Sequence, residues 1–250
     1  MTKIGIIGGS GLENPAIFQD PRVIEVETRY GQPSSPLMTG KISGVDTVLL
    51  ARHGVDHQFS PTQVNNRANI MAMQKVGVSH IIATTACGSL RKEIERGHLV
   101  VLDQFIDFTR FRKNTFFDSF ADGAHHTAMA HPFAEELRQK LYDVGKNMQL
   151  PVHAAGCVVT IEGPRFSTVA ESKMFRLWGA DVINMSTAPE VMLANELSIP
   201  YAAVAMSTDY DCWKEDEMPV TWDEILTVFR QNADNVTGLL VKVIETFNKK

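Results

Sequence analysis

The chain has 250 residues, of which 44% are hydrophobic and 21% are charged, a composition typical of one soluble globular protein with a large core. Its net charge of −5, without a basic run, argues against nucleic acid as the main partner, and no apolar run is long enough for a membrane span. Three scattered cysteines and the absence of a leader pattern before the first strand predict a cytoplasmic location and no disulfide framework.

Apolar runs of strand length alternate with helical patterns along the chain, which predicts an α/β fold. In chain order, the predicted strands are Lys3–Ile7, Thr47–Ala51, His80–Thr84, His98–Leu102, Ala155–Ile161, Asp181–Asn184 and Tyr201–Met206. The predicted helices are Val64–Lys75, Pro132–Lys146, Thr168–Leu177, Ala188–Leu197 and a last helix from a capping box at Thr221 and Glu224 to Phe247. Asp107–His131 is the one long irregular stretch, and irregular stretches of that length are often functional. We expect a single domain over residues 1–250.

A glycine-rich turn, Gly8-Gly9-Ser10-Gly11, follows the first predicted strand. Glycines let the backbone approach an anion closely and the Ser10 hydroxyl adds a donor, so this turn is a candidate anion site. A tight turn without a ligand is the open alternative. The dinucleotide fingerprint GxGxxG is absent because Asn14 occupies its third glycine position, which disfavours a nicotinamide-dependent dehydrogenase.

Two more predicted strands end in hydrogen-bond donors. Arg52 and His53 follow the second strand, with His57 four residues after His53. Arg matches phosphate with a bidentate fork, and His adds a further donor. The third strand leads into the hydroxyl-rich run Thr84-Thr85-Ala86-Cys87-Gly88-Ser89. Three donor-rich strand ends together favour an anion site over three unrelated turns.

Two helix starts carry candidate ligand contacts. Phe166 lies just before the helix at Thr168, where Glu171 completes a capping box. An aromatic ring there can stack on a flat heterocycle, although it can equally belong to the core. Glu190 lies in the first turn of the next helix and is a candidate partner for ribose hydroxyls; stabilisation of the helix dipole is its alternative role.

Two carboxylates follow the last predicted strand, in the run Ser207-Thr208-Asp209-Tyr210-Asp211-Cys212-Trp213. The carboxyl ends of parallel strands are the usual place for ligands in an open α/β sheet. Alternate residues leaving a strand point the same way, so Asp209 and Asp211 can face one ligand together. Paired carboxylates are a standard acid/base device, whereas helix capping or turn closure is the structural alternative.

Taken together, these segments resemble the trimeric purine nucleoside phosphorylases and, among them, the 5'-methylthioadenosine phosphorylases. The resemblance spans nearly the whole chain, through IGIIGGSGL, LLARHG, TTACGSL, TIEGPRFS, WGADVINMSTAPE and STDYDCW. It implies a pentosyltransferase with that family's fold, in which phosphate attacks C1' of a purine nucleoside and releases the base and a ribose 1-phosphate. It also implies phosphate as co-substrate, no metal or organic cofactor, and a homotrimer.

The resemblance assigns roles residue by residue. The phosphate-binding residues it implies are Ser10, Arg52, His53, Thr85, Ala86 and Ser186. The nucleoside-binding residues it implies are Phe166 and Ser167 at the base, Met185 at the ribose, and His126, Trp222, Ile225 and Leu226 at the 5' end. His126 would reach the 5' end of the nucleoside in a neighbouring subunit. Asp209 would donate a proton to purine N7 as general acid, with Asp211 in a supporting role.

Two positions favour a 6-aminopurine. Relatives specific for inosine and guanosine carry Glu after the stacking Phe and Asn at the position of Asp209, whereas this chain has Ser167 and Asp209. A carboxyl group can accept from a 6-amino group, while a 6-oxo group needs a donor. The resemblance therefore implies 5'-methylthioadenosine as substrate, yielding adenine and 5-methylthioribose 1-phosphate; adenosine, inosine and methylthioinosine remain alternatives, because Trp222, Ile225 and Leu226 make one wall bulkier than in that family.

Two other classes of protein stay open at this point. A nucleosidase would use water in place of phosphate, and the Ser10, Arg52 and His53 set argues against it. A non-catalytic nucleoside-binding protein would keep Phe166 but would need no acid at Asp209. Dependence of turnover on phosphate separates these classes from a phosphorylase.

Overall fold

The computed structural model describes residues 2–8, 17–121, 123–214 and 221–248, without the side chains at positions 222, 224–226, 229 and 231. Its strands are β1 Lys3–Gly8, β2 Gln19–Ile24, β3 Leu37–Ile42, β4 Val45–Ala51, β5 His80–Ser89, β6 Leu99–Val101, β7 Gln104–Phe108, β8 Val152–His153, β9 Cys157–Ile161, β10 Val182–Asn184 and β11 Tyr201–Tyr210. Its α-helices are α1 Asn66–Lys75, α2 Glu135–Asn147, α3 Val169–Leu177, α4 Thr187–Glu196 and α5 Trp222–Glu245, with a short 3₁₀ turn at Pro61–Gln63.

All described strands form one mixed sheet, in the order β2-β3-β4-β1-β5-β10-β9-β7, with β11, β6 and β8 branching from β5. The ten-residue β5 is its centre, because its first half pairs with β1 while its length pairs with β11, both in parallel. The end of β5 pairs antiparallel with β10, where Ile183 lies opposite Gly88. The strand direction thus reverses between β5 and β10, and such switch points are where open α/β sheets form ligand crevices.

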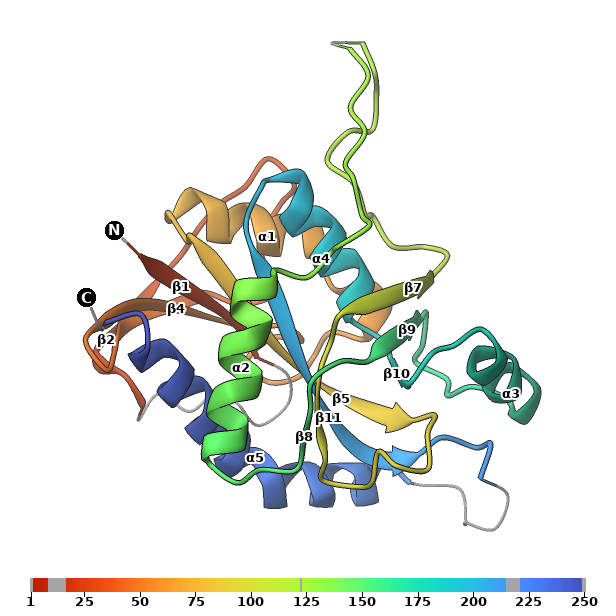
Figure 1. The fold of residues 1–250 in the computed structure, drawn as a ribbon. Coiled ribbons are helices and arrows are strands. Elements are labelled where there is room, and N and C mark those ends of the chain that lie inside the picture. Colours follow the sequence, from red (N-terminus) through yellow and green to blue (C-terminus); the bar gives the residue numbers. More distant parts are fainter. Residues whose placement is uncertain (1, 9–16, 122, 215–220, 249–250) are drawn as a thin grey trace.

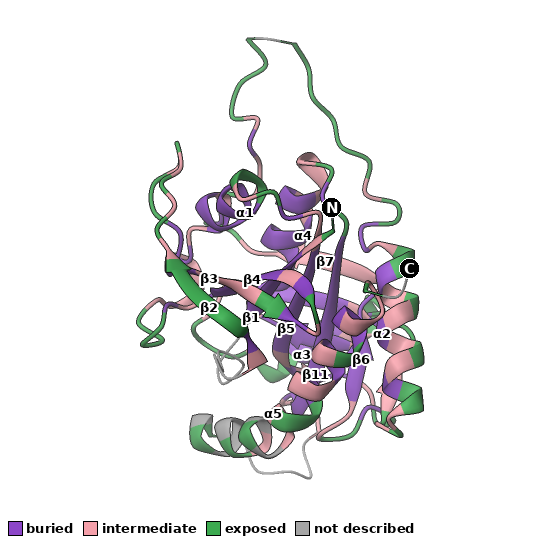
Figure 2. Ribbon diagram, turned by 90° about the vertical axis from the view of Figure 1, so that its left-hand side faces the viewer, coloured by how far each residue is buried: buried purple, intermediate pink, exposed green. Residues whose placement is uncertain are grey.

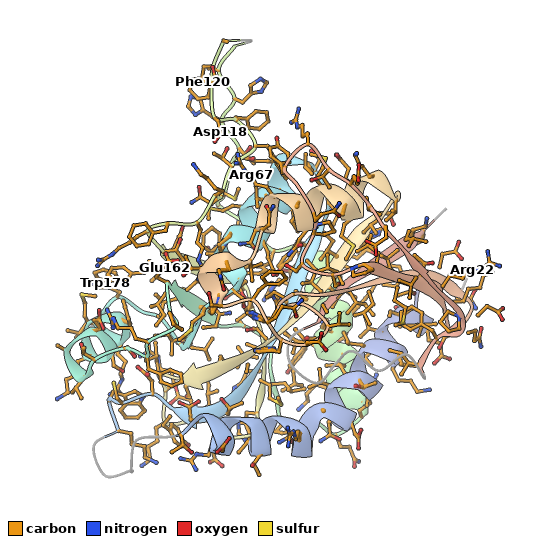
Figure 3. The ribbon with its side chains drawn as sticks, turned by 180° about the vertical axis from the view of Figure 1, so that it is seen from behind. Arg22, Arg67, Asp118, Phe120, Glu162 and Trp178 are labelled. Atoms are coloured by element: carbon orange, nitrogen blue, oxygen red, sulfur yellow. The ribbon has the colours of Figure 1, made fainter. Side chains whose placement is uncertain are left out.

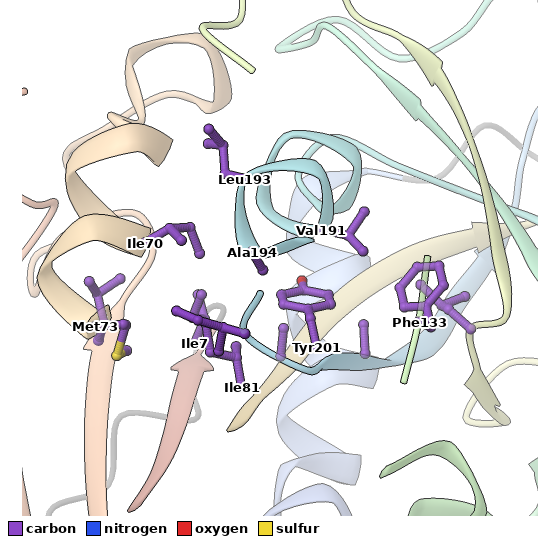
Figure 4. Packing of buried hydrophobic residues seen from close by; sticks show 14 of the residues in the cluster. Ile7, Ile70, Met73, Ile81, Phe133, Val191, Leu193, Ala194 and Tyr201 are labelled. Carbon is purple, nitrogen blue, oxygen red and sulfur yellow. The ribbon is translucent and has the colours of Figure 1, made fainter. Parts of the chain in front are cut away.

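Helices cover both faces of the sheet (Figure 1), and each face has its own hydrophobic core. Alternate residues of a strand point to opposite faces. Ile7 and Ile81 accordingly pack with the α1 and α4 residues shown in Figure 4, whereas Ile6 and Ile82 belong to the core that α2 and α5 cover. The strands between these layers are buried along most of their length (Figure 2), which explains their nearly continuous apolar sequence.

A long irregular segment, residues 109–131, projects from the body of the molecule as an extended arm (Figure 1). Its root is held by Arg67 of α1, which forms an ion pair with Asp118, and by Glu196 of α4, which accepts from the Phe116 amide at 2.6 Å. Beyond this root the arm is mostly exposed (Figures 2 and 3). The prediction that this stretch is irregular is confirmed beyond Phe108, where β7 ends.

The seven predicted strands and the predicted helices are present, with ends shifted by a few residues. The capping box of α3 is confirmed, since the Thr168 hydroxyl accepts from the Glu171 amide and the Glu171 carboxylate accepts from the Thr168 amide. The expected box at Thr221 needs the Glu224 side chain, which lies outside the described residues. Missing from the prediction are β2, β3, β7 and β8, none of which has a continuous apolar run. β2 and β7 form edges of the sheet, β3 lies between β2 and β4, and β8 is a two-residue strand that pairs with β6.

Within the described residues, no helix is both long and apolar enough to cross a membrane.

Candidate active site

A cavity of about 550 Å³ opens where the strand direction reverses. Its walls come from the segment after β4, from β5, from the turn between β9 and α3, from the end of β10 and from the end of β11. The lining residues are Arg52, His53, His57, Phe59, Ser60, Pro61, Thr85, Ala86, Cys87, Gly88, Ile161, Pro164, Phe166, Ser167, Ile183, Asn184, Met185, Ser186, Thr208, Asp209 and Asp211. We call the part formed by Arg52, His53, Thr85 and Ser186 the anion end, and the part formed by Phe166, Ser167, Asp209 and Asp211 the base end.

Arg52 at the anion end is fixed by a buried carboxylate. Its Nε and Nη2 atoms donate to Glu190 of α4 at 2.5 and 3.1 Å, and its Nη1 donates to the Thr84 carbonyl at 2.8 Å. The Tyr201 hydroxyl donates to the same carboxylate at 2.7 Å, and both Arg52 and Glu190 are almost completely buried. Burial and the negative charge of Glu190 raise the pKa of the Tyr201 phenol well above its ordinary value, so it stays a donor.

This arrangement corrects one prediction and specifies another. Glu190 does not line the cavity and pairs with Arg52 instead of contacting a ribose. A buried carboxylate needs such a partner because burial without one is costly. Glu190 occupies the Nε and Nη2 edge of Arg52, while Arg52 also lines the cavity, so phosphate binding by Arg52 stays a prediction.

His53 next to Arg52 is held by a backbone carbonyl. Its Nδ1 lies 2.9 Å from the Phe59 oxygen, which can only accept, so Nδ1 carries the hydrogen. Burial, and then the positive charge of Arg52, lower the pKa of His53 to about 4. The imidazole is therefore neutral at physiological pH. The ring of His57 lies beside it, with 4.7 Å between the ring centroids.

A chain of hydroxyl and amide groups completes the anion end. The hydroxyls of Thr85 and Ser186 lie 3.1 Å apart, and the Asn184 amide donates to Thr85 Oγ1 at 3.3 Å. Asn184 is in turn oriented by the Thr160 hydroxyl, which donates to its Oδ1 at 2.8 Å. These groups come from β5, β9 and the β10–α4 junction, so the packing of three strands sets their positions.

The base end brings both predicted carboxylates together with the predicted Ser. Asp209 and Asp211 are both buried, and the Thr208 hydroxyl donates to Asp209 Oδ1 at 2.7 Å. The Ser167 hydroxyl lies 2.6 to 2.7 Å from the two Asp211 oxygens, which links β11 to the start of α3. The strand runs further than predicted, to Tyr210, and its register with β5 shifts between Ser207 and Asp209.

Gly88 and Cys87 of β5 line the cavity next to the carboxylates of the base end. A Cβ atom on Gly88 would lie 3.2 Å from Asp209 Oδ2, so the missing side chain gives this carboxylate its space. Burial and the nearby Asp209 raise the pKa of the Cys87 thiol well above its ordinary value. That thiol is consequently protonated and no nucleophile at neutral pH.

The mouth of the base end is formed by Phe166, whose side chain is half exposed although it lines the cavity. A half-exposed ring is not part of the hydrophobic core, so that alternative is excluded, while stacking on a heterocycle stays a prediction. Met185 lines the cavity between the two ends. A Cβ atom on Gly163 would lie 2.4 Å from the Met185 sulfur, so the absence of a side chain at Gly163 makes room for Met185.

The sequence analysis did not predict a role for Glu162 and Arg112, which hold a wall of the cavity without lining it. The Glu162 carboxylate accepts from Arg112 Nε at 2.7 Å, from the Thr62 hydroxyl at 2.8 Å and from the amides of Arg110 and Phe111. Arg112 also donates to the Met185 carbonyl at 3.1 Å. Glu162 therefore joins the root of the arm to the cavity wall; Figure 3 labels it. Its partners come from separate segments, so no local pattern could have indicated it.

The structure brings together most of the predicted site residues. Those that line the cavity are Arg52, His53, Thr85, Ala86, Ser186, Phe166, Ser167, Met185, Asp209 and Asp211. His126 does not: it lies exposed on the arm with its ring against Phe120, at 5.4 Å between centroids. Ser10 and the side chains of Trp222, Ile225 and Leu226 lie outside the described residues. Within the described part of the chain, no cluster of three or more His, Cys, Asp or Glu residues could hold a metal ion.

The cavity thus offers cationic and hydroxyl groups at one end and carboxyl groups at the other, with an aromatic ring at its mouth. Such a site can bind an anion and a planar, hydrogen-bonding heterocycle at the same time, and it can hold the bond between them near a proton donor.

Comparison with known proteins agrees with this geometry. Residues 3–245 match the family model of the phosphorylase superfamily. The chain is 52% identical over 246 residues to the S-methyl-5'-thioadenosine phosphorylase of Xenopus tropicalis and 51% identical over 245 residues to that of Danio rerio. Each alignment covers 97% of this chain and 88% of the relative.

Solved structures agree with the sequence comparison. The methylthioadenosine phosphorylase from Schistosoma mansoni in complex with adenine has a similar structure, with a TM-score of 0.94 and 40% identity over 100% of this chain and 93% of that one. A mutant of the adenosine/methylthioadenosine phosphorylase from the same organism, in complex with methylthioadenosine, gives a TM-score of 0.93. The chain therefore belongs to the phosphorylase superfamily, in the family that these methylthioadenosine phosphorylases form.

Proposed function

We propose that this protein catalyses the phosphorolysis of 5'-methylthioadenosine to adenine and 5-methylthioribose 1-phosphate. One observation carries the proposal: a single cavity joins the donor-rich anion end, with Arg52, to the carboxylate-bearing base end, with Asp209. Phosphate is the co-substrate, and the mechanism needs no metal or organic cofactor. The relatives named methylthioadenosine phosphorylases support this substrate over other nucleosides.

Charge development along the bond that breaks explains both ends of the cavity. Cleavage of C1'–N9 leaves the ribose as a cation that resembles an oxocarbenium ion and the purine as a developing anion. A protonated Asp209 neutralises the purine by donating to N7, as a general acid. Phosphate, bound among the groups of the anion end, stabilises the ribose cation and then bonds to C1'.

The base end supports adenine as the purine. The Ser167 hydroxyl donates to Asp211, so Asp211 is oriented by the residue that follows the stacking Phe166. No amide side chain is placed where a 6-oxo group would need a donor, among the described residues of this end. A carboxyl group there accepts from the 6-amino group of adenine.

The arm supports a proposal about assembly. His126 is exposed and does not line its own chain's cavity, and it belongs to a segment that projects from the molecule (Figure 1). We propose that the arm reaches the 5' end of the nucleoside in a neighbouring subunit of a homotrimer. A cytoplasmic location and a role in purine and methionine salvage belong to the same proposal.

Adenosine is the second candidate substrate. A solved relative that is 40% identical to this chain is named an adenosine/methylthioadenosine phosphorylase. The two nucleosides differ only at the 5' substituent, so the choice between them depends on the 5' end of the site and not on the base end.

A single assay tests the proposed reaction and the assignment of its purine. Methylthioadenosine, adenosine, inosine and methylthioinosine are compared side by side, with and without phosphate, by following release of the free base. We expect phosphate-dependent turnover with the two 6-aminopurine nucleosides well ahead of the two 6-oxopurine nucleosides. Equal turnover in phosphate-free buffer would contradict the phosphorylase reaction, and a preference for inosine would contradict the assignment of the base end.

A further inference from the structure

The free nitrogen of His53 has a defined role that follows from its partner on the other side of the ring. Nδ1 donates to the Phe59 carbonyl at 2.9 Å, which leaves Nε2 as the nitrogen with a lone pair while the ring is neutral. None of the described residues forms a hydrogen bond with Nε2. His53 lines the cavity in the same corner as Arg52, Thr85 and Ser186. A nitrogen acceptor therefore lies in the same part of the cavity as the Arg52 charge and the hydroxyls of Thr85 and Ser186.

The groups around His53 keep the ring neutral. Arg52 precedes it in the chain, Arg112 acts on it from the root of the arm, and His57 lies against it with 4.7 Å between centroids. Both Arg side chains that act on His53 are themselves paired, Arg52 with Glu190 and Arg112 with Glu162. Among the described residues, no carboxylate acts on His53 to stabilise an imidazolium, so burial, then Arg52, and then His57 and Arg112 lower its pKa to about 4.

We propose that Nε2 of His53 accepts a hydrogen bond from the P–OH group of hydrogen phosphate, so that the anion end selects an oxyanion that carries a proton. The inference rests on the proposed phosphorolysis and specifies the form of its co-substrate. The proton stays on the phosphate. Because the protonated oxygen is held at His53, the unprotonated oxygens are left for the positive and hydroxyl groups of the anion end and for C1'.

This selection predicts discrimination between two anions of the same shape and charge. Sulfate is a dianion at neutral pH and has no hydrogen to offer, so one of its oxygens would face the lone pair of Nε2 without a hydrogen bond. A buried acceptor left without a donor costs binding free energy. Sulfate becomes a good ligand only when His53 is protonated, and above the pKa of a group its protonated fraction falls about tenfold per pH unit.

Isothermal titration calorimetry of the intact protein with inorganic phosphate and with sulfate tests the inference. At pH 7.5 we expect phosphate to bind at least about tenfold more tightly than sulfate, since a buried unpaired acceptor costs on the order of 1–3 kcal/mol. Monofluorophosphate, in which fluorine replaces the OH group, should bind as weakly as sulfate, and arsenate, which keeps an OH group, should bind like phosphate. As the pH falls from 7 to 5, sulfate affinity should rise steeply, whereas phosphate affinity should not.

Two variants provide the matched comparison. His53→Asn places an amide that can donate to sulfate, so the preference for phosphate over sulfate should shrink by at least about fivefold, the equivalent of one ordinary hydrogen bond. His57→Asn alters the neighbouring ring and should keep the preference. The wild-type pH series needs no variant, so it decides the question even if His53→Asn does not fold.

The outcomes separate this inference from the proposed function. Equal affinity for phosphate and sulfate at pH 7.5, in a protein that cleaves methylthioadenosine with phosphate, overturns the role of His53 alone. Sulfate affinity that does not change with pH also overturns it. Absence of phosphate-dependent cleavage overturns the proposed function, whichever anion binds.

Discussion

The two ends of the cavity are buried to different degrees and depend differently on the rest of the fold. At the anion end, Arg52 is 2% exposed and pairs with Glu190, which is 0% exposed, so the charge of this end is part of the core between the sheet and α4. At the base end, Phe166 is 49% exposed, and the carboxylates of Asp209 and Asp211 accept hydrogen bonds from the neighbouring hydroxyls of Thr208 and Ser167. Changes at the anion end should therefore reduce stability together with activity, whereas changes at the base end should reduce activity alone.

Asp209→Asn gives the largest expected change in activity. Loss of a general acid lowers kcat by roughly 10²–10⁴, while the isosteric amide should leave the melting temperature nearly unchanged. The variant should also narrow the gap between methylthioadenosine and inosine, because an amide can donate to O6. Kinetics with both nucleosides and a thermal melt measure these effects. An unchanged kcat on methylthioadenosine rules out Asp209 as the acid.

Glu190→Gln is the corresponding change at the anion end. Removal of one partner of a buried ion pair leaves Arg52 uncompensated and should lower the free energy of unfolding by about 3–5 kcal/mol. Tyr201→Phe is the control, because it removes only the hydroxyl donor to the same carboxylate, at 2.7 Å, and leaves the ion pair in place. Urea unfolding of the two variants measures the difference, and equal stability of Glu190→Gln and the wild type would contradict the comparison between the two ends.

The sequence predicts the fold well where one segment contains the whole signal. The buried strands are nearly all apolar, so β1, β4, β5 and β11 could be recognised from residue pattern alone. The edge strand β2 could not, because five of its six residues are exposed. Edge strands bury too little apolar surface to produce a recognisable pattern.

The sequence predicts those site residues that lie at the ends of recognisable strands. Donors after β4 and β5 and carboxylates on β11 meet because the ends of these strands converge in one cavity. The partner of Glu190 could not be predicted, since Arg52 lies 138 positions away in the chain. Glu162 was missed for the same reason, because its partners lie on two other segments, one at Thr62 and one at residues 110–112.

Ser167→Ala should have a smaller effect, confined to nucleoside binding. The variant removes the hydroxyl that lies 2.6 to 2.7 Å from the Asp211 carboxylate. A hydrogen bond to a charged group contributes about 1.5–3 kcal/mol, so KM for methylthioadenosine should rise by roughly ten- to a hundredfold. KM for phosphate should stay within about twofold of the wild-type value, since the anion end is untouched. A matching rise in both KM values would show that the two ends are not independent.

Glu162 belongs to neither end of the cavity, and its contribution should appear as a change of stability with pH. Burial acts to raise its pKa, but hydrogen bonds from the Arg110 amide, the Arg112 side chain, the Phe111 amide and the Thr62 hydroxyl outweigh that effect and lower the pKa to about 2, against an ordinary value of 4.5. The folded state therefore stabilises the ionised form of Glu162 more than the unfolded state does. Its contribution is therefore complete above about pH 4.5 and is lost as the pH falls from there towards 2.

Comparison of Glu162→Gln with the wild type should show this dependence directly. The difference in the free energy of unfolding between the two proteins should be constant above about pH 5.5 and shrink as the pH falls to 3, because protonation of Glu162 makes the wild type resemble the amide. Glu171→Gln is the matched control: the pKa of Glu171 is also lowered to about 2, chiefly by Arg165, but that Arg side chain is 63% exposed. Solvent screens exposed pairs, so 0.5 M salt should weaken the pH dependence at Glu171 and leave most of it at Glu162, where Arg112 is 2% exposed. Equal sensitivity to salt at the two positions would mean that the Glu162 cluster is no better shielded from solvent than a surface ion pair.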